Sequence, residues 1–158
     1  MAGEVCSWLP QQILRQHSHR PEHHLRWLVD DLRVILIGDM DGFPIDTAAY
    51  LPDVTEVEAA GYIPGGMALA DPRVEYDQPT RQVRLHAAPS VWPDSRIVAE
   101  GAVIWKHTDT LDPLLGVVDF DGPRVSVDGV FEIEWDPELG ALAYEVVVPA
   151  RFGGAVFA

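Results

Sequence analysis

Four histidines lie within eight positions of the sequence, at His17, His19, His23 and His24. Imidazole is the commonest ligand of transition metals in proteins, so the cluster raises the question of a metal site. The spacing argues against one, because Pro21 begins a new helix between His19 and His23, and the adjacent His23 and His24 diverge by about 100° on a helix. We therefore predict a solvated polar segment and no metal ligand.

Two acidic motifs, DMDG at 39–42 and DFDG at 119–122, resemble the first positions of a calcium-binding EF-hand loop. That loop requires a bidentate glutamate six residues after the glycine, where Ala48 and Asp128 stand in this sequence. Neither motif continues as a calcium site. We interpret each one as a turn that closes a hairpin.

The stretch AVIWKHTDTLDPLLGVVDFDG at 102–122 contains two apolar runs around a loop with Asp109 and Asp112. A carboxylate-lined site is one interpretation of this loop. Asp112 stands directly before Pro113, however, which is a common way to begin a turn. The stretch therefore predicts two core strands joined by an Asp-Pro turn.

Four carboxylates lie close together at Glu132, Glu134, Asp136 and Glu138, as a hydrolase with paired acid and base would require. Glu132 and Glu134 point the same way from the solvent face of a predicted strand, and nothing near them would desolvate one to raise its pKa. Cys6 is the only cysteine and has no identified histidine partner. We predict a non-enzymatic protein with no catalytic residues and no cofactor.

Three tryptophans of the strand-rich region have side chains large enough to stack on sugars or on a partner protein. Trp105 and Trp135 occupy alternating positions of predicted strands, so we assign them to the core. Trp92 stands between Val91 and Pro93 in a predicted turn. It is our candidate for an exposed contact with a partner.

The composition limits the classes of partner. With 11 basic and 25 acidic side chains the formal net charge is −14, which makes binding to nucleic acid or to an anionic membrane electrostatically unfavourable. A single cysteine excludes an internal disulfide framework. The sequence shows neither a secretory signal nor an apolar run of about 20 residues that would span a bilayer.

The helical signal is concentrated in PEHHLRWLVDDLR, where Leu25, Leu28, Val29 and Leu32 mark one face at helical spacing. This pattern predicts a helix over 21–31, which a shorter helical turn at 11–16 precedes. We expect residues 1–20 to form an N-terminal segment that extends as an arm, and residues 21–158 to form a single β-rich structural domain.

The remainder predicts strands separated by turns, after a long connection at 42–66 that is rich in turn residues. The stretch VFEIEW at 130–135 alternates apolar residues with glutamates, as in an antiparallel strand with one buried face. We predict a mainly β fold, either an antiparallel β-sandwich or a curved sheet, with one N-terminal helix packed at its edge. The predicted strands cover 33–39, 73–77, 82–87, 96–105, 114–120, 124–127, 130–135 and 141–148.

The sequence contains an ordered series of short motifs: AVIWK at 102–106, DPLLG at 112–116, VDFDG at 118–122 and VDGVFEIEWD at 127–136. This series resembles a family of small tailed-bacteriophage virion structural proteins. Weaker likeness continues upstream through LRVILIGDM, PDVTEVEAAGY and the pair Gly65-Gly66, so that the resemblance covers about 25–145.

The resemblance implies a particle component that is synthesised in the host cytoplasm and incorporated in the virion. Its expected partners are other virion proteins, the major capsid protein or tail proteins, together with further copies of itself in a symmetric oligomer. The first choice is a capsid decoration or cement protein on the outer capsid surface. The alternatives are a tail or fibre-associated virion protein, or a soluble carbohydrate-binding β-sandwich module that uses Trp92.

Overall fold

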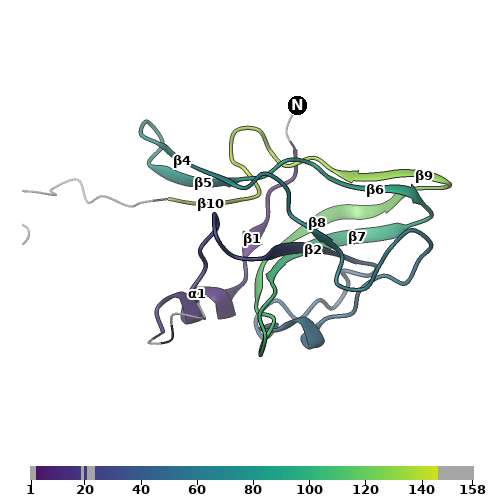
Figure 1. The fold of residues 1–158 in the computed structure, drawn as a ribbon, viewed down its shortest axis with the longest axis horizontal. Helices are drawn as coiled ribbons and strands as arrows, with labels where there is room; N and C mark the ends of the chain where they lie inside the picture. The colour runs from purple at the N-terminus through teal and green to yellow at the C-terminus, as the bar shows by residue number, and fades with distance from the viewer. Residues whose placement is uncertain (1–2, 19, 21–23, 146–158) are drawn as a thin grey trace, which may run out of the picture.

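The structure, a computed structural model, describes residues 3–18, 20 and 24–145. It is mainly β, with antiparallel sheets in two layers and a helix near the N-terminus, as predicted (Figure 1). Within these ranges no helix is long and apolar enough to cross a membrane.

The first layer is a five-stranded sheet in the order β1-β8-β7-β2-β3, in which all pairs are antiparallel. Strands β7 and β8 form the hairpin predicted at 102–122, and the loop with Asp112 joins them. The strands of this sheet are β1 (Ser7–Trp8), β2 (Leu32–Ile37), β3 (Met67–Ala68), β7 (Val98–Lys106) and β8 (Leu114–Val125).

Both faces of the five-stranded sheet are covered. Along β2, Val34 and Leu36 belong to a core cluster shared with the second layer, whereas Ile35 and Ile37 belong to a cluster on the other face. The long connection between β2 and β3 covers this other face, and its Ala48 is fully buried there. A strand that is buried on both faces has a continuous run of apolar residues, and this is why the sequence RVILIGD predicts a strand.

The second layer consists of two smaller sheets, in the orders β10-β5-β4 and β6-β9. Strand β6 was not predicted, and the predicted strand at 124–127 overlaps the end of β8 and is not a separate strand. Positions 146–148 of the last predicted strand lie outside the described residues. The strands are β4 (Arg73–Asp77), β5 (Gln82–His86), β6 (Ser90–Ser95), β9 (Gly129–Ile133) and β10 (Leu142–Glu145).

The helix lies earlier than predicted. It is α1 (Pro10–Gln16), where only a short helical turn was expected, and Pro10 occupies its first turn, the position that tolerates proline best. The predicted helix over 21–31 is wrong where the structure describes it, because residues 24–31 form only a short turn. Two contacts compete with the helix there, a hydrogen bond from the Trp27 indole and a buried ion pair of Asp30.

The described part of the segment 1–20 is integrated in the fold. Strand β1 pairs with β8, and the backbone N–H of Cys6 donates to the carbonyl of Ala141 at 2.7 Å. Leu9 is fully buried in the core cluster on the outer face of the five-stranded sheet. In this structure residues 3–18 therefore lie against the β-rich domain.

The long connection contains a short 3-10 helix, η2 (Leu51–Asp53), which the carboxylate of Asp53 caps. Its Oδ2 accepts the backbone N–H groups of Tyr50 at 2.9 Å and Ala49 at 3.0 Å. These hydrogen bonds from the backbone favour the ionised form and hold the pKa of Asp53 below its ordinary value of 3.8.

Replacement of Asp53 with alanine is expected to lower the free energy of unfolding by about 0.5–1 kcal/mol at neutral pH. Because the pKa of this carboxyl is lower in the folded than in the unfolded protein, its contribution is present above pH 3.8 and is lost as the pH falls through the folded value. Urea unfolding of both proteins between neutral pH and about pH 2 measures this. A difference that persists unchanged at the lowest pH would contradict the ionic capping role.

Candidate functional site

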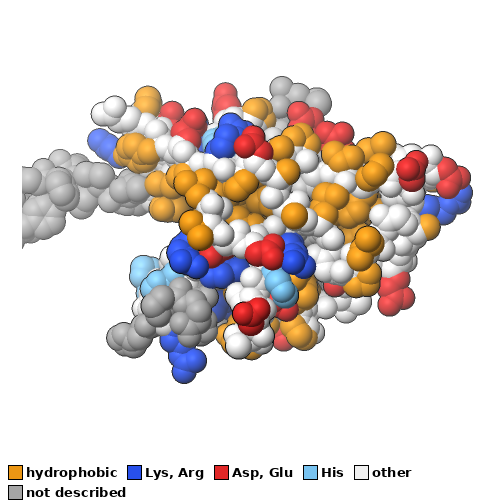
Figure 2. Space-filling view, viewed as in Figure 1, with side chains coloured by type: hydrophobic (Ala, Val, Ile, Leu, Met, Phe, Trp, Pro, Cys, Tyr) orange, Lys and Arg blue, Asp and Glu red, His pale blue; other side chains and the backbone are white. Residues whose placement is uncertain are grey.

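A groove of about 510 Å³ opens between helix α1, residues 25–27 and the β10-β5-β4 sheet. Strand alternation builds its sheet side, because the register places Val74 beside Leu85 and Val83 beside Tyr144. All four side chains line the groove. Figure 2 shows hydrophobic side chains gathered over the region that these strands occupy in Figure 1.

The opposite face of the same sheet is polar. Arg84 lies 3.6 Å from Glu75 and 3.5 Å from Asp77, and His86 Nε2 lies 3.5 Å from Glu75. The three-stranded sheet is therefore amphipathic, and its apolar face is the one turned toward α1. Covering such a face with apolar side chains lowers the free energy of the system, because it removes apolar surface from water.

The wall opposite the sheet includes Trp8, Ile13 and Trp27. Both indole N–H groups donate to backbone carbonyls, Trp8 to Ala143 and Trp27 to His86, each at 2.9 Å. These two aromatic side chains therefore present carbon surface to the groove, and their polar atoms are already satisfied.

The polar residues of α1 at the groove are bonded to one another. Gln12, fully buried, donates through Nε2 to Gln16 Oε1 at 3.1 Å and accepts from Arg15 Nη2 at 2.9 Å. Gln16 Oε1 also accepts the backbone N–H of Leu25 at 2.9 Å. Arg15 continues the network to the carbonyl of Leu114 at 2.6 Å. The groove therefore suits an apolar occupant better than a polar small molecule.

The rim of the groove leaves hydrophobic side chains half exposed. Ile13, Val74 and Tyr144 retain 45%, 47% and 49% of their accessible surface, and Tyr76 lies near them on the same face of β4. Strand β4 is also an outer strand of its sheet in the described part of the chain, so one side of its backbone has no strand partner. An apolar groove beside an unpaired strand edge is typical of a protein-binding surface.

Trp92 is not an exposed contact, so that prediction is wrong. Its side chain is 3% exposed and packs in the core, with ring centroids 6.3 Å from Tyr62 and 6.0 Å from Phe131. The residue lies in β6 and not in a turn. The predicted burial of Trp105 and Trp135 is confirmed, at 2% and 4% exposed.

The structure describes two of the four clustered histidines. His17 is exposed beside the groove, and His24 Nε2 lies 2.8 Å from the carbonyl oxygen of Ser18. His19 and His23 lie outside the described residues. In the described ranges no group of three or more histidine, cysteine, aspartate and glutamate side chains is arranged to hold a metal ion.

The aspartates of the two acidic motifs stabilise local backbone bends. Asp39 Oδ1 accepts the N–H of Asp41 at 2.9 Å, and Asp119 Oδ1 accepts the N–H of Asp121 at 2.8 Å. The first motif forms a turn after β2. The prediction that the second motif closes a hairpin is wrong. This motif lies within β8, at the point where the register with β7 shifts. It is a bulge, in which Asp121 adopts a φ of 60°.

The carboxylates near the end of β9 do not converge on a site. Glu132 and Glu134 are both exposed, as the strand alternation predicted. Asp136 is 9% exposed, and its Oδ1 accepts the backbone N–H groups of Glu138 and Leu139 at 2.8 and 2.9 Å. Asp136 therefore stabilises a turn.

Cys6 and Tyr62 are ionisable residues that are buried in the core. Burial, together with the nearby Glu4, raises the pKa of the Cys6 thiol well above its ordinary value. Burial and a hydrogen bond to Glu56 likewise raise the pKa of the Tyr62 hydroxyl, which donates to Glu56 Oε1 at 2.5 Å and accepts the N–H of Leu36. Because nucleophilic attack requires a thiolate, Cys6 is unreactive in the folded protein.

Comparisons of the chain with protein-family models, with curated proteins and with solved structures found no match.

Proposed function

We propose that this chain is a non-enzymatic structural component of a tailed-phage virion and that it acts as a capsid decoration or cement protein. The observation that carries the proposal is the groove, whose walls present carbon atoms and whose rim leaves hydrophobic side chains half exposed. Binding of a protein segment to a surface of this kind is favourable, because it removes apolar surface from water.

The sequence motifs support the same proposal. AVIWK forms the end of β7, DPLLG leads into the start of β8, and the motif at 127–136 contains β9. Most of their apolar residues are buried, so the motifs encode a core and not a chemical site. The net charge of −14 favours a basic protein surface as the docking partner and disfavours the packaged nucleic acid.

Mass spectrometry of purified particles tests the proposal. We expect the chain in every particle, at a copy number in fixed proportion to the major capsid protein. Capsids depleted of the chain are expected to unfold at a lower temperature in calorimetry, and re-addition of the protein should restore the original value. Absence from purified particles would contradict the proposal in all its forms.

The tail-associated alternative predicts a different outcome of the same experiment. The copy number would then follow the tail proteins, and capsid stability would not change on re-addition. The carbohydrate-binding alternative relied on Trp92, whose burial leaves it unable to stack on a sugar. We therefore do not propose it.

A further inference from the structure

The sequence that follows β10 differs in character from the rest of the chain. Residues 146–158 read VVVPARFGGAVFA, in which Arg151 is the only charged side chain. In a chain of net charge −14, this segment is apolar and carries a positive charge. Its composition matches the groove, and its charge is opposite to that of the molecule as a whole.

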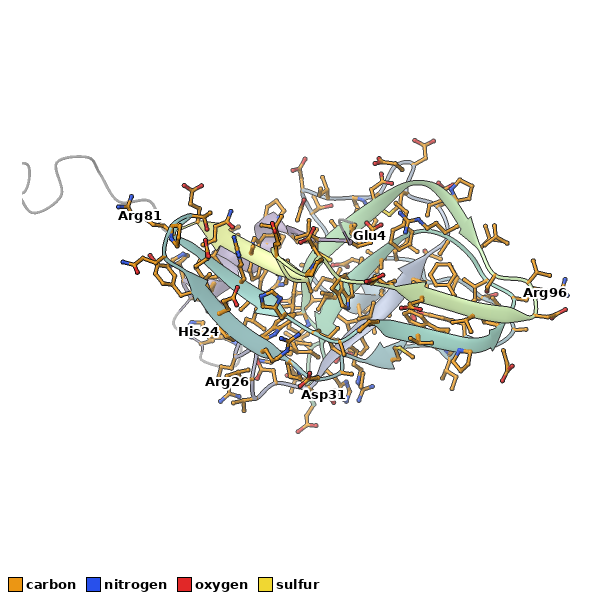
Figure 3. The ribbon with its side chains drawn as sticks, turned by 90° about the horizontal axis from the view of Figure 1, so that it is seen from above. Glu4, His24, Arg26, Asp31, Arg81 and Arg96 are labelled. Atoms are coloured by element: carbon orange, nitrogen blue, oxygen red, sulfur yellow. The ribbon has the colours of Figure 1, made fainter. Side chains whose placement is uncertain are left out.

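Strand β10, which precedes the segment, ends beside the groove and at the end of its sheet. Tyr144 lines the groove, and the last pair of β10 with β5 joins Glu145 to Gln82. Gln82 is the first residue of β5, so β5 offers no further partner after Glu145. Arg81, next in the turn, marks this end of the sheet in Figure 3. A return to the groove of the same molecule would require the chain to reverse direction.

A second molecule offers an identical groove. When fully extended, residues 146–158 reach roughly 40 Å, enough to cross to a neighbouring copy. Beside the groove, one edge of β4 has no strand partner among the described residues, and it presents backbone N–H and C=O groups to an added strand. Alternate side chains of that strand would cover the half-exposed Val74 and Tyr76 on the apolar face of β4.

We propose that residues 146–158 of one copy of this chain bind in the groove of a second copy, as a strand added beside β4. The backbone pairs with β4, and the apolar side chains fill the space between the sheet and α1. This exchange builds an oligomer from copies of one chain, and it names a second copy as the protein partner of the groove on which the virion proposal rests.

Cross-linking between two single variants of the full chain tests the proposal. Val74→Cys protein is mixed with Phe152→Cys protein and treated with a short bis-maleimide. The native Cys6 is buried and its thiol is protonated, so it does not compete. We expect covalent dimers that contain one copy of each variant, because Val74 lines the groove and Phe152 belongs to the bound segment.

The matched control replaces Val98, which is as exposed as Val74, at 53% against 47%, but does not line the groove. It stands two residues from Arg96, which Figure 3 shows at the opposite end of the molecule from Arg81. Val98→Cys mixed with Phe152→Cys is expected to give at least about tenfold less dimer. Equal yields from both mixtures would overturn the proposal. So would a Val74→Cys/Phe152→Cys double variant that links only within one molecule, because the segment would then occupy its own groove.

Analytical sedimentation measures the self-association of the chain without a cross-linker. Phe152→Asp is expected to weaken self-association at least about tenfold, since it places a charge against apolar surface. Ile13→Asp at the groove should do the same, whereas Leu14→Asp, exposed on α1 but outside the groove lining, should not. Circular dichroism establishes that each variant is folded. Unchanged association of folded Phe152→Asp refutes the exchange, whatever the particles contain.

Discussion

Replacement of Gly66 with alanine is expected to lower the free energy of unfolding by about 4 kcal/mol or more. Gly66 immediately precedes β3 and adopts a φ of +73°, a conformation that disfavours side chains. A Cβ at this position would overlap the carbonyl oxygen of Val34 and lie 2.6 Å from its carbonyl carbon. Because β2 is buried at the centre of the fold, its backbone cannot shift to make room, and β3 would have to separate from it.

Gly42 provides the matched control. Its φ of +74° is almost the same, but an added Cβ would meet nothing within 4 Å. Gly42→Ala should therefore cost only the conformational strain, about 1 kcal/mol. Urea unfolding of the two variants separates the strain of the backbone from the overlap with β2. Equal losses of stability would show that the close approach of Gly66 to Val34 contributes nothing.

Replacement of Lys106 with methionine is expected to lower the free energy of unfolding by about 3 kcal/mol. The ammonium group lies 3.2 Å from Asp30 Oδ2 and donates to the carbonyl of His24 at 3.0 Å. The side chains of Lys106 and Asp30 are only 7% and 2% exposed. Loss of the lysine leaves a buried carboxylate whose remaining ionic partner, Arg26, is largely exposed. The variant should melt at a lower temperature in calorimetry.

Two further variants identify the cause. Lys106→Met combined with Asp30→Asn removes both charges and should recover at least about 1 kcal/mol of the loss, since the amide oxygen can still accept the N–H of Arg26. Arg96→Met breaks the Arg96–Asp128 pair, in which both side chains are exposed, and should change stability by less than about 0.5 kcal/mol. A double variant less stable than Lys106→Met alone would refute the buried-charge explanation.

The strands were the most predictable part of the fold because their signal is local. At 130–135, the alternation that predicts a half-buried strand corresponds to buried Phe131 and Ile133 and exposed Glu132 and Glu134. The continuous apolar run of β2 likewise reflects burial of both its faces. In each case the residue types at alternating positions carry the information.

The helix over 21–31 illustrates how tertiary contacts override a local pattern. Helical spacing placed Leu28 and Val29 on a buried face, yet they are 62% and 71% exposed. Trp27 is buried in their place, because its indole binds a β5 carbonyl, and Asp30 turns inward to Lys106. Neither partner can be identified from the residues between 21 and 31.

Trp92 was misplaced because Pro93 indicates a turn in most contexts. In the structure, Pro93 lies where the pairing of β6 with β9 is interrupted between Trp92 and Ser95. Proline is tolerated at such a bulge because no ladder hydrogen bond is required of it. The same dipeptide therefore fits a turn with an exposed tryptophan and a bulge with a buried one.

The groove was not predictable because no single segment contains it. Its lining comes from β1 and α1, from residues 25–27, from the β4-β5 hairpin and from β10. The signal that could have pointed toward it is the apolar alternation of VEY, VRL and LAY, which lie in three of the predicted strands. What covers that face depends on the topology, which sequence periodicity does not report.

The pairing of β1 with β8 has a consequence for the order of events during synthesis. Residues 3–9 are made before the rest of the described chain, yet their partners are β8, Trp135 and Ala141. Residues 3–9 cannot form all of these contacts until almost all of the described chain has been made. Because such contacts between distant parts of a sequence slow folding, we expect this protein to fold on the scale of milliseconds to seconds. Residues 3–9 therefore lack these partners until late in translation, and until then they are exposed to wrong partners.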